Sequence, residues 1–208
     1  MRPRTLDELA GQQDAVGPGS WLFAAIRTDS LSSVILFGPA GTGKTSIAHI
    51  IAESTRAAFV EVSAIGGTVS DLRREISAAE KRLVVSGMRT ILFVDEIHRF
   101  NRGQQDALLH AVENRTVVLI GATTENPYFE VNSALISRSR VIELQALSDA
   151  DIASIVRRAL DDDRGLKGEF SLEEEALDAI VNLSGGDARS ALTTLELSAG
   201  LARDAARA

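Results

Sequence analysis

The segment Ser32–Thr55 reads SSVILFGPAGTGKTSIAHIIAEST. Its apolar part, Val34–Phe37, predicts a buried strand, and the isoleucines that follow at helical spacing predict a helix. Between them, Gly38–Thr45 matches the pattern G-x-x-x-x-G-K-[ST] at every fixed position. Glycines let backbone N–H groups close around phosphate oxygens, and the start of the helix adds a positive electrostatic potential. Strand, loop and helix in this order predict a phosphate-binding loop rather than a chance glycine-rich turn.

The pattern also predicts which atoms of the loop would hold a nucleotide. Lys44 is expected to reach the β- and γ-phosphates of ATP, and the Thr45 hydroxyl is expected to ligate Mg²⁺. The predicted nucleotide-binding residues of the loop are Gly38, Pro39, Ala40, Gly41, Thr42, Gly43, Lys44, Thr45 and Ser46.

The composition limits the class of protein. The chain has 208 residues, of which 45% are hydrophobic, so it can form a core of its own. A formal net charge of −7 argues against non-specific coating of DNA by the whole surface. The absence of cysteine excludes disulfides and thiolate metal sites. Because no apolar run is long enough to cross a membrane, we expect a cytoplasmic protein with no membrane partner.

Strands and helices alternate along the first two thirds of the chain. Apolar runs predict strands over residues 32–38, 57–64, 89–96, 116–124 and 140–144, and helical spacing predicts helices over 21–27, 45–55, 69–87, 102–114 and 132–139. Because the strands are apolar throughout, we expect a parallel five-stranded sheet covered by helices on both faces.

The strand pattern stops after Leu144. Helices are expected over 147–163, 171–184 and 186–202. We therefore predict an α/β nucleotide-binding domain over residues 1–145 and a small all-helical domain over 146–208.

Two of the C-terminal helices carry a predicted start signal. Ser148 with Asp151, and Ser171 with Glu174, fit the capping-box pattern.

Two adjacent carboxylates, Asp95 and Glu96, end the third predicted strand. A phosphate loop needs an acidic group on a neighbouring strand to hold Mg²⁺, usually through water, and Asp95 fits this role. Glu96 points in a different direction and could orient and activate the water that attacks the γ-phosphate. The alternative is a solvated strand end, which the neighbouring phosphate loop makes the weaker interpretation.

Polar residues and arginines follow the later strands. Thr123 and Thr124 end the fourth predicted strand, where buried hydroxyls would lie beside the γ-phosphate. Arg138 precedes the fifth strand, and Arg189 lies near a helix start. An arginine that meets the γ-phosphate stabilises the charge of the transition state. Each arginine alone would be a surface residue, but the order of all these features favours a catalytic set.

That order resembles the AAA+ ATPases, in the clade of the clamp loaders and the RuvB Holliday-junction motor. The segments RPRTLDELAGQ, DEIHRFNRGQQDALL, LIGATTENPYFEVNSALISRSRV and GGDARSAL look most like the family of replication-associated recombination protein A, which includes the Werner helicase-interacting protein. The resemblance runs from Arg2 to about Ala199. Its most specific part is GATTENPYFEVNSALISRSR.

The resemblance implies roles for single residues. Thr124 would be the sensor 1 residue that orients the water, Arg189 the sensor 2 residue that reads the nucleotide in cis, and Arg138 the arginine finger that acts in trans on an adjacent subunit. Adenine would lie against the segment before the first strand, at Leu9 and Ala10, and ATP would bind in the cleft between the two domains.

Two further residues follow the carboxylates, and two interpretations of them stay open. His98 and Arg99 either relay the state of the nucleotide to a neighbouring subunit or to DNA, or they only pack and cap locally.

The resemblance also implies partners. This chain would be the ATPase core of a longer, tetrameric, nucleoid-associated protein that acts on DNA at stalled forks or gaps, at junctions of single and double strands. A sliding clamp or a single-strand-binding protein would be further partners. The alternative is a protein-remodelling or clamp-associated scaffold ATPase without direct DNA coupling. A branch-migration motor would need a winged-helix domain after the helical one.

A DNA-contacting segment is expected after the second strand. Its candidate phosphate contacts are the side chains of Arg73, Arg74, Lys81 and Arg82 and the backbone N–H groups of Gly66, Gly67 and Thr68. Acidic residues alternate with these basic ones, so a solvated amphipathic helix is an equal interpretation.

Overall fold

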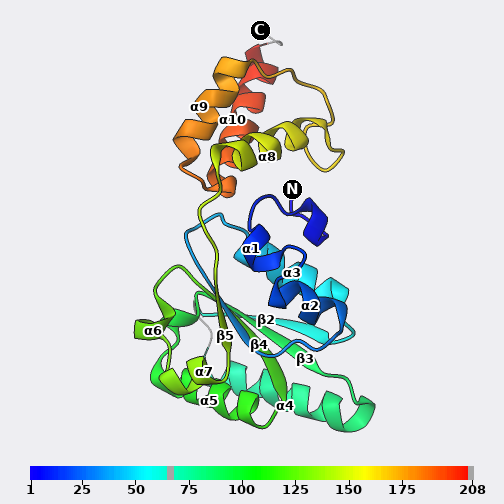
Figure 1. Cartoon of the computed structure of the whole chain (residues 1–208), viewed down its shortest axis with the longest axis vertical. Coiled ribbons are helices and arrows are strands. Elements are labelled where there is room, and N and C mark those ends of the chain that lie inside the picture. Colours follow the sequence, from blue (N-terminus) through cyan, green and yellow to red (C-terminus); the bar gives the residue numbers. More distant parts are fainter. Residues whose placement is uncertain (65–67, 206–208) are drawn as a thin grey trace. The chain divides into compact units, whose positions relative to one another are not determined.

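The computed structural model describes residues 1–64 and 68–205 (Figure 1). Its contacts divide the chain into two compact units. The sheet unit consists of Gln13–Gly38 and Lys44–Leu144. The helical unit consists of Met1–Gln12, Pro39–Gly43 and the residues from Gln145 onward.

The sheet unit is built on five parallel strands, as the sequence predicts. They are β1 (Val34–Phe37), β2 (Ala58–Ser63), β3 (Thr90–Asp95), β4 (Val117–Thr123) and β5 (Arg140–Glu143), in the order β2-β3-β4-β1-β5. The three central strands are almost completely buried. Burial on both faces explains why their sequences are continuous apolar runs rather than alternating ones.

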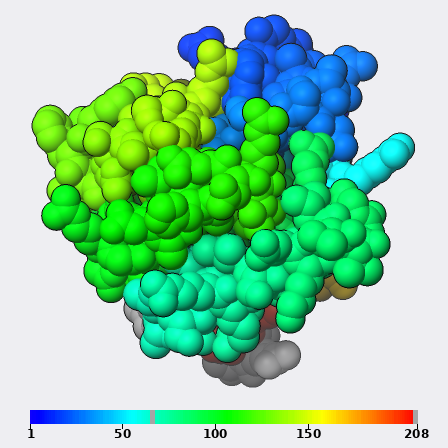
Figure 2. Space-filling view, turned by 90° about the horizontal axis from the view of Figure 1, so that it is seen from below, coloured from blue at the N-terminus to red at the C-terminus, as the bar shows by residue number. Residues whose placement is uncertain are grey.

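Helices cover both faces of this sheet (Figure 1). On one face lie α1 (Gln13–Val16), α2 (Trp21–Arg27) and α3 (Lys44–Ser54), and on the other lie α4 (Val69–Ser86) and α5 (Arg102–Glu113), which Figure 2 shows from outside. Leu72 of α4 and Leu108 of α5 belong to one buried cluster with Leu92 of β3. Each such side chain contributes roughly 1.5–3 kcal/mol by its burial.

Short helical segments shape the connections of the sheet unit. After β3 comes the 3-10 helix η2 (Ile97–Arg99), and after β4 come α6 (Pro127–Glu130) and α7 (Ser133–Ser137). Side-chain oxygens of Asn126 and Asn132 accept the N–H groups that open α6 and α7, respectively. These caps fix where the chain turns before β5.

The helical unit contains α8 (Asp149–Asp161), α9 (Glu174–Ser184) and α10 (Ala188–Ala205), preceded far upstream by the 3-10 helix η1 (Leu6–Glu8). The predicted capping box at Ser148 is confirmed, since its hydroxyl accepts from the Asp151 N–H and the Asp151 carboxylate accepts in return. The capping box predicted at Ser171 is wrong, because α9 begins at Glu174 with Glu173 at its cap. Acidic residues here stabilise the first turn through the helix dipole instead.

The first residues of the chain pack within the helical unit. Arg158 donates to the Glu8 carbonyl at 2.6 Å, and Arg164 forms an ion pair with the Glu8 carboxylate at 3.1 Å. Arg164 also donates to Asp162 and so holds the pKa of that carboxyl below its ordinary value. These contacts join the first residues to positions about 150 residues later in the sequence, whereas the domain boundary predicted from the sequence lies at residue 145 alone.

Among the described residues, no helix is both long enough and apolar enough to cross a bilayer.

Candidate nucleotide-binding site

The phosphate loop leaves β1 and enters α3 within the sheet unit. Gly38 donates its N–H to the Thr123 carbonyl at 3.2 Å, which ties the start of the loop to the end of β4. Lys44 is the first residue of α3 and is buried, and its Nζ donates to the Gly38 carbonyl at 2.7 Å. The ammonium group therefore lies back over the start of the loop, where it can meet an anion held by the N–H groups of the helix start.

The middle of the loop, Pro39–Gly43, belongs to the helical unit. Gly41 and Gly43 have φ values of 69° and 99°, in the left-handed region that favours glycine. A Cβ atom at Gly41 would lie 1.9 Å from the Asp187 carboxylate, and one at Gly43 would lie 3.3 Å from the Leu9 side chain. Leu9, predicted to contact the nucleotide, therefore packs against the phosphate loop itself.

Replacing Gly41 with Ala is expected to weaken ATP binding about tenfold or more. The added methyl group would strain a left-handed backbone, at roughly 1–3 kcal/mol, and would collide with Asp187, so the loop must move. Binding of a fluorescent ATP analogue measures the effect. Gly200→Ala is the matched control, because a Cβ there meets nothing within 4 Å. Unchanged affinity of the Gly41 variant would show that the loop does not need this conformation.

The carboxyl ends of β1, β3 and β4 meet at one edge of the sheet. Phe37 of β1 is paired with Thr123 of β4, and Val94 of β3 is paired with Gly121 of β4. Asp95, which ends β3, and Lys44, which follows β1, therefore project from the same edge. In open α/β sheets this edge is where ligands bind.

Glu96 has an unusual backbone conformation. Its φ and ψ are 54° and 46°, in the left-handed region that a non-glycine residue rarely adopts. Its N–H donates to Asp95 Oδ1 at 3.1 Å. The carboxylate that follows this turn lies beside His98, whose Nε2 is 3.4 Å from Glu96 Oε2. Strained backbone of this kind clusters at functional sites.

The two threonines that end β4 have different environments. Thr123 is fully buried, and its hydroxyl lies 2.9 Å from His98 Nδ1 and accepts from the Glu125 N–H at 3.0 Å. Thr124, the predicted sensor residue, is exposed. The expectation of buried hydroxyls thus holds for Thr123 alone, and nothing in the local pattern distinguished the two.

The oxygen atoms at this edge suit Mg²⁺. The two predicted ligands, the Thr45 hydroxyl and the Asp95 carboxylate, are hard oxygen donors, which Mg²⁺ prefers. Within residues 1–64 and 68–205 no group of three or more His, Asp or Glu side chains could hold a metal by itself. Two protein oxygens without such a cage are what Mg²⁺ uses when waters and substrate phosphates complete its shell.

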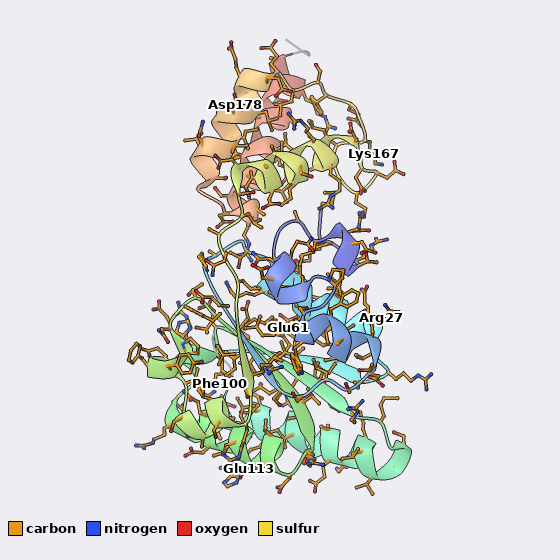
Figure 3. All side chains as sticks on the ribbon, in the orientation of Figure 1. Arg27, Glu61, Phe100, Glu113, Lys167 and Asp178 are labelled. Carbon is orange, nitrogen blue, oxygen red and sulfur yellow. The ribbon has the colours of Figure 1, made fainter. Side chains whose placement is uncertain are left out.

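Arg138 lies at the opposite edge of the sheet. It precedes β5, whose first residue, Arg140, is paired with Val34 at the start of β1. The guanidinium of Arg138 is half-exposed, donates to the Ala134 carbonyl at 3.0 Å and forms an ion pair with Glu113 at 2.7 Å. Glu113 is the last residue of α5 and is labelled in Figure 3. Arg138 also lines a hollow of about 500 Å³, beside Trp21 and Tyr128 among others.

Arg189 lies in the first turn of α10, in the helical unit, and its side chain is exposed. Its N–H donates to the Asp187 carboxylate at 2.8 Å, and the Ser190 N–H donates to the same oxygen at 3.1 Å. Asp187 therefore caps α10 while it packs against Gly41 of the phosphate loop. Ala10, the other predicted adenine contact, is half-buried against the core of the helical unit.

The sequence did not predict two contacts near the loop, that of Asp187 with Gly41 and that of Gln12 with Gln145, although Gln12 ends the segment expected to face adenine. The Gln12 side chain donates to the Gln145 carbonyl at 2.6 Å and accepts from the Gln145 N–H at 3.1 Å, so it joins the first residues of the chain to the segment that enters the C-terminal helices. Gln12 has a φ of 61°, in the left-handed region, and the sequence alone does not indicate this conformation. Both contacts join residues more than a hundred positions apart, beyond the range of local patterns.

The chain is similar in sequence to named bacterial proteins. It is 46% identical over 205 residues to an uncharacterised AAA domain-containing protein of Mycobacterium tuberculosis, covering 99% of this chain and 45% of that protein. It is 47% identical over 204 residues to replication-associated recombination protein A of Escherichia coli K12, covering 97% of this chain and 45% of that protein. The chain thus spans less than half the length of these relatives.

Solved structures of similar fold include a RuvB Holliday junction branch migration motor of Thermotoga maritima. That structure has a TM-score of 0.74 and 28% identity, and the match covers 94% of this chain and 64% of the RuvB chain. Residues 34–147, more than half of the chain, match the model of the ATPase family associated with various cellular activities (AAA). These residues include the phosphate loop from Gly38, both carboxylates and Arg138. The chain therefore belongs to the AAA family of ATPases, of the clamp-loader and RuvB type.

Proposed function

We propose that this chain is the ATP-hydrolysing part of a replication-associated recombination protein, which converts ATP and water to ADP and phosphate with Mg²⁺ and couples this reaction to DNA at stalled forks or gaps. The observation that carries the ATPase proposal is the common sheet edge, from which the phosphate loop, Asp95 and Glu96 all project. The names of relatives with 45–47% identity support the link to replication and recombination.

In this proposal each residue at this edge of the sheet has its own role in ATP binding or hydrolysis. Lys44 and the loop N–H groups bind the phosphates, while Thr45 and Asp95 hold Mg²⁺, which neutralises phosphate charge. Glu96 accepts a proton from the attacking water, and Thr124 orients that water. Arg189 reads the nucleotide in cis, and Arg138 reaches the ATP of an adjacent subunit in trans.

The DNA part of the proposal needs a local contact surface, and α4 offers only a partial one. Arg73 and Lys81 are exposed, but Arg74 pairs with Asp71 at 3.1 Å and with Glu75 at 3.4 Å. Gly66 and Gly67, two of the expected backbone donors, lie outside the described residues.

The other expected contacts of this segment are already used within the chain. The Thr68 N–H does not serve as a free donor, because it donates to Asp71 in the cap of α4. Arg82 donates to the Thr90 hydroxyl at 2.9 Å. These pairings favour the second candidate function, a protein-remodelling or clamp-associated ATPase, since they leave few cations for phosphate contacts.

Partners beyond ATP are part of the same proposal. We infer a homo-oligomer, because Arg138 lies at the sheet edge opposite Asp95. The resemblance to the recombination-protein family supports a tetramer in the longer protein. A sliding clamp or a single-strand-binding protein would bring the ATPase to DNA in the cytoplasm, at the nucleoid.

Phosphate release in the presence of DNA distinguishes the two functions. For a DNA-coupled ATPase, DNA with single-strand/double-strand junctions is expected to raise turnover several-fold more than plain duplex at fixed salt. The stimulation should fall as salt increases, because phosphate contacts release counterions. Arg73→Ala should reduce it, and Arg115→Ala, an exposed arginine outside α4, is the matched control. Equal turnover with and without junctions would favour the protein-remodelling function.

A further inference from the structure

Both ring nitrogens of His98 have partners at the candidate site. Nδ1 lies 2.9 Å from the Thr123 hydroxyl, and Nε2 lies 3.4 Å from Glu96 Oε2. The side chain of His98 is 14% exposed and that of Glu96 is 27% exposed. One imidazole thus bridges the end of β4 and the carboxylate that follows β3.

The Thr123 hydroxyl ties His98 to the segment that follows β4. It accepts from the Glu125 N–H at 3.0 Å and lies 3.2 Å from the Glu125 carbonyl, to which it can donate. Its contact with His98 Nδ1, at 2.9 Å, is the shortest of the three, and it leaves Nε2 as the ring nitrogen that faces Glu96.

Glu96 needs such an anchor. Its left-handed backbone, with φ of 54°, costs roughly 1–3 kcal/mol and persists only where neighbours determine it. Among the described residues, the cation nearest its carboxylate is Arg99, whose Nε lies 3.9 Å from Oε2, beyond hydrogen-bond range, on a side chain that is 58% exposed. The contact from His98, at 3.4 Å, is therefore the shorter and better shielded of the two.

We propose that His98 is a positioning residue, which fixes the Glu96 carboxylate and links it to Thr123. The inference rests on the proposed role of Glu96 as the base. A displacement of the β4 end, where Gly38 of the phosphate loop is also bonded to the Thr123 carbonyl, is transmitted through the ring to Glu96. His98 itself touches neither phosphate nor water in this role.

Three variants at His98 separate its two contacts. In His98→Gln the amide nitrogen takes the place of Nε2 and keeps the contact with Glu96, whereas in His98→Asn the shorter side chain reaches only Thr123. His98→Ala removes both contacts. We expect His98→Ala and His98→Asn to lower ATP turnover roughly 10- to 100-fold through displacement of the base, and His98→Gln to retain more. ATP affinity should stay within about twofold of that of the unmodified protein.

A merely structural role for His98 predicts a different result. Turnover would then follow thermal stability, and Gln would have no advantage over Asn. Equal turnover of Gln and Asn, or undiminished turnover of His98→Ala, would overturn the proposal. His110→Ala is the matched control, because that histidine is 76% exposed on α5 and lies outside the proposed site.

The link to Thr123 has its own test. If the ring transmits the position of Thr123, the double variant His98→Ala/Thr123→Val should lose no more turnover than the worse single variant. Additive losses would overturn the link.

Failure of this inference is separable from failure of the proposed function. If Glu96→Gln keeps turnover, Glu96 is not the base, whatever His98 does. If Glu96→Gln loses turnover while His98→Ala keeps it, only the positioning role fails.

Discussion

Glu96→Gln is expected to bind ATP with unchanged affinity and to lose turnover by a factor of about 10²–10⁴. The amide has the shape of the carboxylate, so it can keep the contact with His98 Nε2, and the left-handed turn keeps its hydrogen bond from the Glu96 N–H to Asp95. What the amide lacks is a basic oxygen that can take a proton from water. Binding should therefore survive while the chemical step fails.

Two measurements on the same samples test this expectation. Titration of a fluorescent ATP analogue gives the affinity, and continuous phosphate release gives turnover. Glu61→Gln is the matched control, because Glu61 is an exposed residue of the edge strand β2, labelled in Figure 3. Equal loss of affinity and turnover in Glu96→Gln would mean that the carboxylate only supports the structure of the site.

The elements that the sequence predicted are those whose pattern lies within one short stretch of the chain. The apolar runs of β1, β3 and β4 fix these strands because burial on both faces permits few polar residues. The phosphate loop was predicted because its glycines are required by backbone conformation, as the left-handed Gly41 illustrates.

Features set by contacts between distant residues were not predictable in this way. The pairing of Gln12 with Gln145 and the approach of Asp187 to Gly41 join segments that share no local pattern. The wrong cap at Ser171 has a related cause. A capping-box sequence occurs wherever Ser precedes Glu by three residues, and here the chain leaves it outside the helix.

Within the site, residue types were easier to predict than their geometry. The pair Asp95–Glu96 was expected at a strand end, but the left-handed backbone of Glu96 was not, because Glu seldom adopts it. The two open interpretations of His98 were relay and local packing. Its contacts with Thr123 and Glu96 became visible only once β3 and β4 were placed side by side.

Arg138→Ala is expected to lower the turnover of the assembled protein by about 10³-fold or more, as loss of an arginine finger does. Arg138 lies before β5 and Asp95 ends β3, so the length of the sheet separates them within one chain. A strand of the length of β5, four residues, spans about 13 Å, farther than a guanidinium hydrogen bond can bridge. In the proposed function, the site that Arg138 completes therefore belongs to another copy of the chain.

The ion pair between Arg138 and Glu113 does not prevent this role. Both side chains are partly exposed, and breaking such a surface pair costs about 0–1 kcal/mol. A 10³-fold gain in rate corresponds to about 4 kcal/mol of transition-state stabilisation. We therefore expect the γ-phosphate of a neighbouring subunit to displace Glu113 from Arg138 in the assembled protein.

Mixing two inactive variants tests the action in trans directly. Lys44→Ala subunits lack phosphate binding but keep Arg138, and Arg138→Ala subunits keep an intact ATP site. If Arg138 acts in trans, the mixture must release phosphate faster than the sum of its parts, because some interfaces join an intact site to an intact arginine. Arg102→Ala, an exposed residue at the start of α5, replaces Arg138→Ala in the control mixture. No recovery from assembled mixtures would place Arg138 in its own subunit's site, against the register of β5 on β1.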